Sequence, residues 1–202
     1  MPEIIPQDYF RHEDVVGIAR DLIGTILVTN VDNTITSAII VETEAYKGPE
    51  DKACHAYNNR LTPRTEVMFK EGGIAYVYIC YGIHRLFNVV TGPEGVGSAV
   101  LIRGVEPLQG LETMFIRRNN NQKMHNLTQG PGLVSQALGI TTDHNGVPLI
   151  LTNEIWLENA ENVPDDQVIA SPRVGVEPSG PIWSKMPWRF RLKGNKWVSP
   201  AK

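Results

Sequence analysis

One run of residues limits the possible fold more than any other, because it is apolar and yet ends in two carboxylates. Residues 37–46 read SAIIVETEAY, so the apolar stretch 38–41 continues directly into Glu42 and Glu44. Burying an ionised carboxylate without a partner is costly. We therefore expect either that the strand has reached the surface, which the local pattern favours, or that the two acids lie at the rim of a pocket.

The composition is that of a globular protein with one sizeable core. The chain has 202 residues, of which 42% are hydrophobic and 20% are charged. Its first residues lack the basic start and apolar core of a secretory signal, and no apolar run approaches the ~20 residues that span a bilayer. Two cysteines make no disulfide framework. These features predict a cytosolic protein that does not contact a membrane.

The charges are unevenly distributed along the chain. The net charge of −3 argues against a nucleic-acid partner, since such domains are usually basic. However, residues 1–55 carry ten acids and four bases, whereas residues 173–202 carry seven bases and one acid. A basic face that binds a phosphate backbone would explain this asymmetry. A solvated basic tail would explain it equally well.

Apolar spacing and turn signals predict one mixed domain, with no internal repeat and no linker. Helical spacing is found at 15–23, 108–119 and 133–138. Strand patterns lie at 25–30, 34–46, 75–80, 85–90, 97–107, 150–152, 155–157, 172–176 and 188–193. The segment 47–73 is rich in turn signals, and NNNQKMHN at 119–126 is predicted to be a mobile loop.

The segment GIAYVYICYGIHRLFNVV, residues 73–90, predicts a hairpin with an aromatic face. Alternation places Tyr76 and Tyr78 on one side of the first strand, and Gly82 breaks the pattern, so residues 81–84 form the expected tip. An aromatic stripe on a strand usually packs in a core, but Tyr81 at the tip would project outward. Exposed aromatic residues beside basic ones suit base stacking and insertion into a duplex.

Basic residues and a carboxylate lie close to this aromatic set in the sequence. Arg60, Arg64 and Arg85 would hold phosphates, and Glu44 beside an aromatic slot suggests activation of water next to a stacked ring. A metal site is the weaker alternative, because carboxylates two residues apart also occur on ordinary strands. Its ligands would be Glu42, Glu44, His55 and His84. Phosphate loops, zinc-type cysteine pairs and nucleophile elbows are absent from the sequence, so we expect no metal and no cofactor.

Five longer segments resemble the alkyladenine, or 3-methyladenine, DNA glycosylase family. They are VETEAYKGPEDKACHAYNNRLTPRT, MFKEGGIAYVYICYGIHRLFNVV, AVLIRGVEPLQG, GPGLVSQALGI and RVGVEPSG with WRFRLKGNKWVS. The resemblance runs from about Phe10 to the C-terminus with nearly uniform spacing. It implies one α+β domain over residues 1–202, with a curved antiparallel sheet, surrounding helices and a protruding β-hairpin that inserts into the DNA minor groove.

The resemblance also implies roles for individual residues. The catalytic residues would be Glu44, which activates water, and Arg103, which helps to position it. The damaged base would be bound by Tyr46, His55, Tyr78 and Asn88, the last of which crowds the 2-position of the purine. The contacts to DNA would come from Arg60, Thr62, Arg64, Tyr81 and Ile83.

Two positions depart from the family pattern. Leu133 stands where members usually carry lysine, which removes one expected contact to the DNA backbone. Ile83 and His84 replace the bulkier Met-Tyr pair of the mammalian members, so we expect a smaller wedge beside Tyr81.

The predicted activity is that of a base-excision-repair DNA glycosylase. It would flip alkylated or deaminated purines out of double-stranded DNA, among them 3-methyladenine, 7-methylguanine, hypoxanthine and ethenoadenine, and hydrolyse the N-glycosidic bond. No lysine stands in the motif positions as an amine nucleophile, so we expect an abasic site without strand cleavage. We expect the protein to act as a monomer in the bacterial cytosol.

Three alternatives remain open. A damage-binding protein of the same fold would keep the pocket but lack catalysis. A carboxylate and histidine metallohydrolase would act on a small substrate. A structural domain with a basic tail would bind nucleic acid without preference for lesions, and would leave the tip tyrosine without a role.

Overall fold

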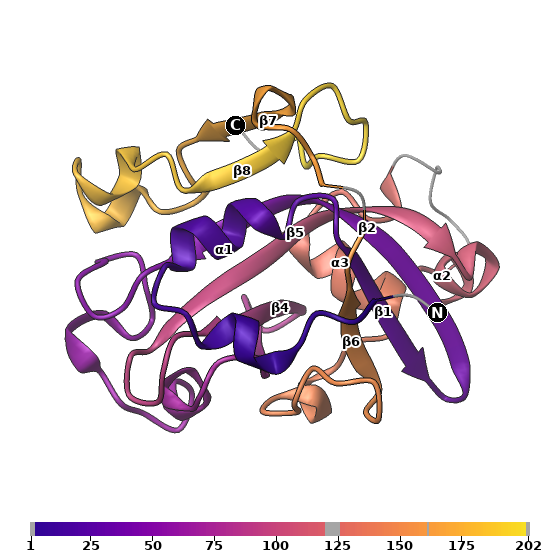
Figure 1. The fold of residues 1–202 in the computed structure, drawn as a ribbon, viewed down its shortest axis with the longest axis horizontal. Coiled ribbons are helices and arrows are strands. Elements are labelled where there is room, and N and C mark those ends of the chain that lie inside the picture. Colours follow the sequence, from indigo (N-terminus) through magenta and orange to yellow (C-terminus); the bar gives the residue numbers. More distant parts are fainter. Residues whose placement is uncertain (1–2, 120–125, 161, 201–202) are drawn as a thin grey trace.

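The computed structural model describes residues 3–119, 126–160 and 162–200, and one antiparallel sheet runs through all of them (Figure 1). Its strands are β1 (Ile26–Val31), β2 (Thr34–Tyr46), β3 (Ala75–Cys80), β4 (His84–Thr91), β5 (Ser98–Gln109), β6 (Ile155–Glu158), β7 (Val168–Ser171) and β8 (Arg189–Leu192). The strand order is β3-β4-β5-β2-β1-β6, and β8 joins β2 to β7. The predicted α+β class with a curved antiparallel sheet is confirmed.

Three α-helices and seven short 3-10 helices accompany the sheet in the described residues. The α-helices are α1 (Val15–Asp21), α2 (Leu111–Arg117) and α3 (Pro131–Leu138). The 3-10 helices are η1 (Gln7–Arg11), η2 (Tyr57–Asn59), η3 (Glu66–Phe69), η5 (Thr142–His144), η6 (Asp165–Gln167), η7 (Glu177–Ser179) and η8 (Trp183–Lys185). None of the described helices is both long and apolar enough to cross a membrane.

The two predicted hairpins form as the sequence indicates. Asp32 and Asn33 connect β1 to β2 with φ angles of 55° and 57°, the left-handed conformation that a two-residue hairpin turn requires. Three residues connect β3 to β4, and the first two of them, Tyr81 and Gly82, have positive φ angles of 51° and 74°. The tip predicted at residues 81–84 is therefore confirmed at 81–83, whereas His84 already belongs to β4 and pairs with Cys80.

Strand β2 is the centre of the sheet because it changes partners along its length. Its first half pairs with β1, from Val31 opposite Thr34 to Ile26 opposite Ile39. Register shifts against β5 follow on both sides of Glu42, and such bulges bend a strand. Beyond the bend, residues 42–44 pair with β8 on the edge that β1 has left. Chain segments that are about 150 residues apart are thereby joined.

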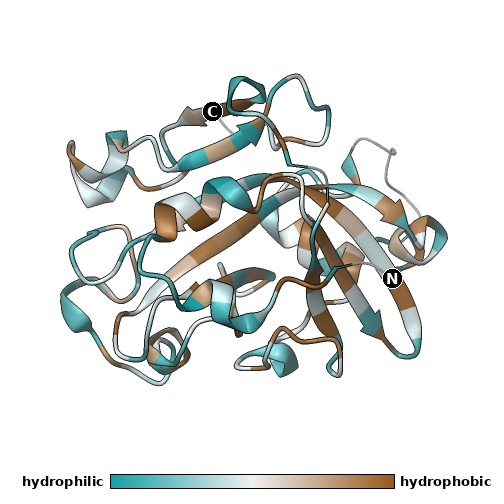
Figure 2. Cartoon of the chain, viewed as in Figure 1, coloured by the Kyte–Doolittle hydropathy of each residue, from teal (hydrophilic) through white to brown (hydrophobic). Residues whose placement is uncertain are grey.

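Apolar side chains line the sheet and the helices that cover it (Figure 2). Helix α1 packs against β2 and β5, and α3 packs against β4 and β5 from the other side (Figure 1). The main core between them includes Phe10, Leu22, Phe87, Ile102 and Leu138, all essentially without exposure. A second, smaller cluster lies under the turn-rich segment 47–73 and carries Tyr46 and Tyr78 on its border.

Several local predictions were wrong at their ends or altogether. The helix expected at 108–119 begins at Leu111, because β5 continues to Gln109 and pairs there with Ser37. No strand forms at 150–152, where the backbone turns and the N–H of Asn153 bonds to Ile150. The last predicted strand but one lies at 168–171 and not at 172–176, since Pro172 cannot donate a ladder hydrogen bond. The predicted loop 119–126 falls mostly outside the described residues.

Glu42 and Glu44 are both fully buried, so the expectation that the strand ends at the surface was wrong. Glu42 is stabilised by charged and polar donors from three parts of the chain. Its carboxylate accepts hydrogen bonds from Arg103 Nε (3.3 Å) and Arg189 Nε (2.6 Å). The backbone N–H and the hydroxyl of Ser199 donate at 2.7 and 2.9 Å. This carboxylate therefore ties β5, β8 and the C-terminal segment to β2.

Internal pairs account for part of the uneven charge distribution of the sequence. Arg189 pairs with Glu42, and Arg173 pairs with Asp51, with both members of the second pair fully buried. Two of the seven basic residues after position 172 are thus not available to bind phosphate. Neither a basic face nor a solvated tail accounts for them.

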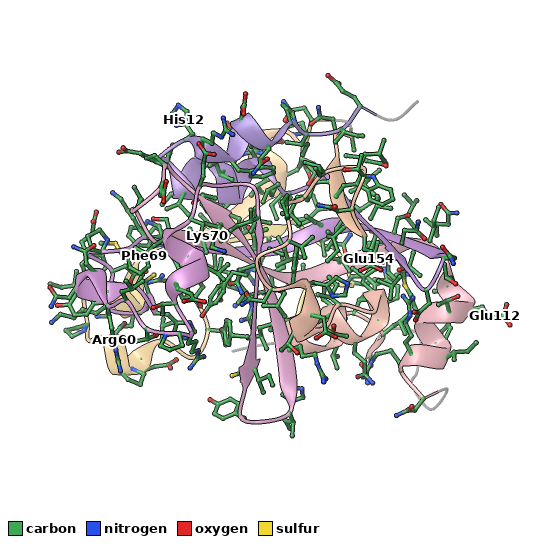
Figure 3. All side chains as sticks on the ribbon, turned by 90° about the horizontal axis from the view of Figure 1, so that it is seen from below. His12, Arg60, Phe69, Lys70, Glu112 and Glu154 are labelled. Carbon is green, nitrogen blue, oxygen red and sulfur yellow. The ribbon has the colours of Figure 1, made fainter. Side chains whose placement is uncertain are left out.

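The substitution Glu42→Gln is expected to lower the free energy of unfolding by about 3–5 kcal/mol, because it leaves two buried guanidinium groups without their shared carboxylate. Urea denaturation followed by circular dichroism measures the change. Glu112→Gln, at an exposed position on α2 (Figure 3), is the matched control and should change stability by less than about 0.5 kcal/mol. Equal stabilities of the two variants would contradict this role of Glu42.

Candidate active site

A cavity of about 520 Å³ opens beside the end of β2 and the base of the β3–β4 hairpin, a size typical of ligand pockets. The turn-rich segment, the hairpin, β5, the start of α3 and the segment 174–176 all contribute to its wall. Of the residues predicted to act in catalysis or recognition, those that line it are Tyr46, His55, Arg64, Tyr78, Tyr81, Asn88 and Arg103. Segments that are distant in the sequence therefore meet at one hollow.

Glu44 is not part of the cavity wall but lies directly behind it. Its carboxylate accepts hydrogen bonds from the hydroxyl of Tyr46 (2.8 Å), the backbone N–H of Val174 (2.8 Å) and Arg103 Nη1 (3.4 Å). All three donors line the cavity, so Glu44 is separated from the cavity by its own partners. Rigid backbone at the end of a buried strand holds the carboxylate in this position.

Burial raises the pKa of Glu44, while Arg103 and the N–H of Val174 act in the opposite direction. Burial, and after it the charge of Glu44, also raises the pKa of the Tyr46 phenol. Tyr46 therefore stays protonated and donates its hydroxyl hydrogen to Glu44. Arg103 bridges Glu42 and Glu44, which fixes its guanidinium at the boundary between the interior and the cavity.

Three aromatic side chains form the wall opposite Glu44. Alternation along β3 places Tyr76 and Tyr78 on the same face, with ring centroids 5.3 Å apart. His55 stands edge-on to Tyr78 at 4.7 Å between centroids and lies 3.0 Å from the Tyr76 hydroxyl through Nδ1. Tyr76 was in the predicted aromatic set without an assigned role, and the structure shows that it holds His55.

Burial and the neighbouring Arg64 together determine the protonation state of His55. Burial, together with the charge of Arg64, lowers the pKa of His55 to about 4. Arg64 Nη2 lies 3.3 Å from His55 Nε2, and because a guanidinium can only donate, Nε2 is the acceptor. The proton of the neutral ring is then on Nδ1, from which it is donated to the Tyr76 hydroxyl.

The three residues predicted to contact DNA from the turn-rich segment lie in different surroundings. The guanidinium of Arg64 stacks over the Tyr78 ring at 4.7 Å, so in the free protein it belongs to the cavity wall. Arg60 is exposed at the edge of the molecule (Figure 3). Thr62 caps the following turn through hydrogen bonds with Thr65. Arg60 and Thr62 do not line the cavity.

Asn88 is buried on β4 and points toward the cavity. Its amide nitrogen donates to the backbone carbonyls of Tyr76 (3.0 Å) and Leu86 (3.3 Å). Two backbone contacts on neighbouring strands thus fix the orientation of this side chain. A side chain held in this way can exclude a substituent by its shape.

The β3–β4 hairpin projects from the body of the molecule (Figure 3). Tyr81 at its tip is 92% exposed and Ile83 is 69% exposed. Tyr81 adopts a positive φ angle, which is uncommon for a residue other than glycine. An apolar tip without a partner is what insertion between bases requires.

The metal alternative finds no support in the arrangement of these side chains. Glu42 and Glu44 share Arg103 between them, and the carboxylate of Glu42 is already engaged by its donors. Among residues 3–119, 126–160 and 162–200, no group of three or more histidine, cysteine, aspartate and glutamate side chains is arranged to hold a metal ion.

Two residues that hold the site together were not singled out from the sequence. Val174 lines the cavity and supplies a backbone N–H to Glu44, and its buried neighbour Arg173 stacks on Tyr46 from outside the cavity. Both stand in the segment RVGVEPSG that contributed to the family resemblance. That segment was the available signal, but its backbone contact cannot be read from residue types.

Comparisons with known proteins identify the family of the chain. The sequence matches the family model described as methylpurine-DNA glycosylase (MPG) over residues 9–196. Three bacterial relatives bear the name "Putative 3-methyladenine DNA glycosylase". The Chlamydia felis protein is 43% identical over 194 residues, covering 96% of this chain and 98% of the relative. The proteins of Natranaerobius thermophilus and Bacillus cereus are 45% and 42% identical, covering 95% and 94% of this chain and 98% and 96% of their own. These matches confirm the resemblance found in the sequence.

We expect the imidazole of His55 to titrate with a pKa of about 4, because burial and the charge of Arg64 both disfavour the imidazolium. Two-dimensional NMR of the histidine side chains against pH measures this value. In Arg64→Gln the repulsion is removed and the pKa rises, but it stays below the ordinary value of about 6.5 because burial is the larger cause.

Arg11→Gln is the control, because Arg11 forms its ion pairs with Asp8 and Glu71 on the surface. It should leave the titration of His55 unchanged. A wild-type midpoint near 6.5 would show that His55 is not enclosed in the cavity wall.

Proposed function

The chain belongs to the methylpurine-DNA glycosylase family, and we propose that it excises alkylated or deaminated purines from double-stranded DNA by hydrolysing the N-glycosidic bond. The observation that carries this proposal is the placement of Glu44. This buried carboxylate lies behind an aromatic-lined cavity at the base of an exposed apolar hairpin. We propose that the protein acts as a monomer and as one glycosylase domain.

The hairpin would turn the damaged nucleotide out of the duplex. An N-glycosidic bond inside stacked DNA cannot be reached, so the base must leave the helix first, at a cost of a few kcal/mol. Tyr81 would enter the space that the base vacates and slow its return, with Ile83 beside it. Arg60 and Thr62, which lie outside the cavity, would contact the phosphate backbone on this side.

The cavity would bind the extruded purine between aromatic rings. Tyr46 and Tyr78, with His55 at the base edge, supply the stacking surfaces, and stacking contributes about 1–3 kcal/mol per base. Both ring nitrogens of His55 have protein partners in the free protein, so the purine edge would bond to Nε2 in place of Arg64. Asn88, fixed by two backbone carbonyls, would crowd the 2-amino group of guanine and exclude it. The substrate class includes 3-methyladenine, 7-methylguanine, hypoxanthine and ethenoadenine.

Hydrolysis would follow at the anomeric carbon. A water between Glu44 and the sugar would attack C1′, the bond from C1′ to the base nitrogen would break, and the proton of the water would pass to Glu44. The negative charge of Glu44 would stabilise the developing oxocarbenium ion, and Arg103 would hold the carboxylate and the water in place. A cationic base leaves without further help, whereas a neutral base must take up a proton.

The cavity composition supports hydrolysis without strand cleavage. Among the described residues that line the cavity, none is a lysine. An amine nucleophile that would form a covalent imine with the sugar is therefore missing from this wall. The product would be an intact strand with an abasic site.

Single-turnover release of hypoxanthine and 3-methyladenine from a labelled duplex, with EDTA present, tests the proposal. We expect release of both bases and strand breaks only after alkali treatment. In Glu44→Gln the rate of release falls by about 10²-fold or more, while lesion DNA is still bound, because the water has lost its base.

Glu50→Gln is the matched control, since Glu50 is exposed and pairs with Lys47 on the surface near the cavity. Near-normal release by Glu44→Gln would remove Glu44 from the mechanism. Absence of release by the wild-type protein, with lesion binding retained, would identify a damage-binding protein instead.

Tyr81→Ser is expected to weaken base extrusion, because the serine side chain cannot fill the gap in the duplex. The measurement is the fluorescence increase of 2-aminopurine placed next to the lesion when protein binds. Leu61→Ser, at another exposed apolar position, is the control and should leave the signal unchanged. An unaltered signal in Tyr81→Ser would contradict the role of the tip.

A further inference from the structure

Two tyrosine rings of the cavity wall, those of Tyr46 and Tyr78, each carry the positive charge of an arginine over one face. The Cζ atom of Arg173 lies 4.7 Å from the centroid of Tyr46, and that of Arg64 lies 4.7 Å from the centroid of Tyr78. These distances are within the range of cation–π interactions. Both rings thus already make a cation–π interaction with an arginine of the chain itself.

Arg173 is fixed on all sides in the interior. It forms two hydrogen bonds to the carboxylate of Asp51, with both side chains fully buried. It also donates to the carbonyls of Ala45 (2.8 Å) and Trp183 (3.2 Å) and lies 5.1 Å from the centroid of Trp188. Such a network leaves the guanidinium no alternative position.

Arg173 covers the face of the Tyr46 ring that is turned away from the cavity. Tyr46 lines the cavity, whereas Arg173 does not and has no exposed side-chain surface. A stacked base and the guanidinium would therefore lie on opposite faces of one ring. Arg173 would act on the base through this ring and not by contact.

This arrangement affects charged and neutral bases differently. A ring attracts a cation through the negative potential of its face, and a guanidinium behind the ring reduces that potential. Asp51 compensates the net charge of Arg173, but only the guanidinium stacks on Tyr46. A neutral purine gains its stacking from dispersion and apolar contact, which the guanidinium does not diminish.

Arg64 adds to the effect from the opposite wall. It lines the cavity itself and touches both Tyr78 and His55, so its charge faces a bound base directly. A cationic purine thus meets one arginine behind the Tyr46 ring and another in the cavity wall beside Tyr78.

We propose that Arg173, supported by Arg64, is a positioning residue that sets substrate specificity by favouring neutral purines over positively charged ones. This inference rests on the proposed glycosylase function and concerns the ranking within its substrate class. Arg173 also fixes the adjacent Val174, whose N–H binds Glu44. Its removal would therefore lower all rates, but it would change their ratio only through the lost charge.

The test compares single-turnover excision of 7-methylguanine, which is cationic, with that of hypoxanthine, which is neutral, in the same duplex. The double variant Asp51→Asn/Arg173→Gln leaves the net charge of the pair unchanged and removes the cation behind Tyr46. We expect the ratio of the 7-methylguanine rate to the hypoxanthine rate to rise about two- to fivefold. Arg173→Lys loses the planar fork but keeps the charge, and its ratio should stay near that of the wild type.

Arg64→Gln, at an exposed position, should raise the ratio in the same direction and tests the contribution of Arg64 separately. An unchanged ratio in this variant would contradict the proposal even if the double variant does not fold. Arg20→Gln, whose arginine pairs with Asp165 far from the cavity, is the control with unchanged rates. If the folded variants lose both excision rates equally, so that the ratio is unaltered, Arg173 has only a structural role and the proposal is wrong. Absence of excision by the wild-type protein would overturn the proposed function itself, and this inference with it.

Discussion

The buried carboxylates of Glu42 and Glu44 and the arginine between them are the interaction on which the structure depends. Removing ionised groups from water is compensated only if their hydrogen-bonding positions are filled. Arg103 contacts both acids, and Arg189 contacts Glu42 from β8. The bend of β2 at these residues gives β8 access to the strand edge that β1 leaves. The pairing of β8 with β2 therefore brings Arg189 to Glu42, and this ion pair in turn stabilises the pairing of the two strands.

The two acids of this cluster lie on one strand but are bound by different parts of the protein. Glu42 is bound by donors from β5, β8 and the C-terminal segment, all on the inside of the protein. Glu44 is bound by three donors that all belong to the cavity wall. A carboxylate so placed is held rigidly and shielded from bulk water, yet only its own hydrogen-bond partners separate it from the cavity. The three donors that fix the position of the Glu44 carboxylate also bury it.

Local sequence patterns correctly predicted the features of the fold that depend on neighbouring residues alone. The hairpin turns at Asp32 and Tyr81, the alternation of β3 and the helix predicted at 133–138 all follow from side-chain periodicity and turn chemistry, although this helix begins two residues earlier, at Pro131. Burial of Glu42 and Glu44 was not predictable, because it depends on arginines 59 to 147 positions away. The position of Arg64 over Tyr78 was missed for the same reason. The family resemblance supplied the candidate residues, whereas the stacking of Arg173 behind Tyr46 can be seen only in the three-dimensional structure.

The sequence separation of the partners of Glu42 has a consequence for biosynthesis. A nascent chain that has left the ribosome as far as β5 contains both acids and Arg103 but lacks Arg189 and Ser199. It also lacks Arg173 and Val174, which complete the surroundings of Tyr46 and Glu44. Contacts of this range form late, so the surroundings of Glu44 and Tyr46 are completed only when translation is almost complete. A chain that terminates soon after β5 would carry every aromatic residue of the pocket but not the partners that hold Glu44 and Tyr46. It would therefore have no complete site that could act on intact DNA.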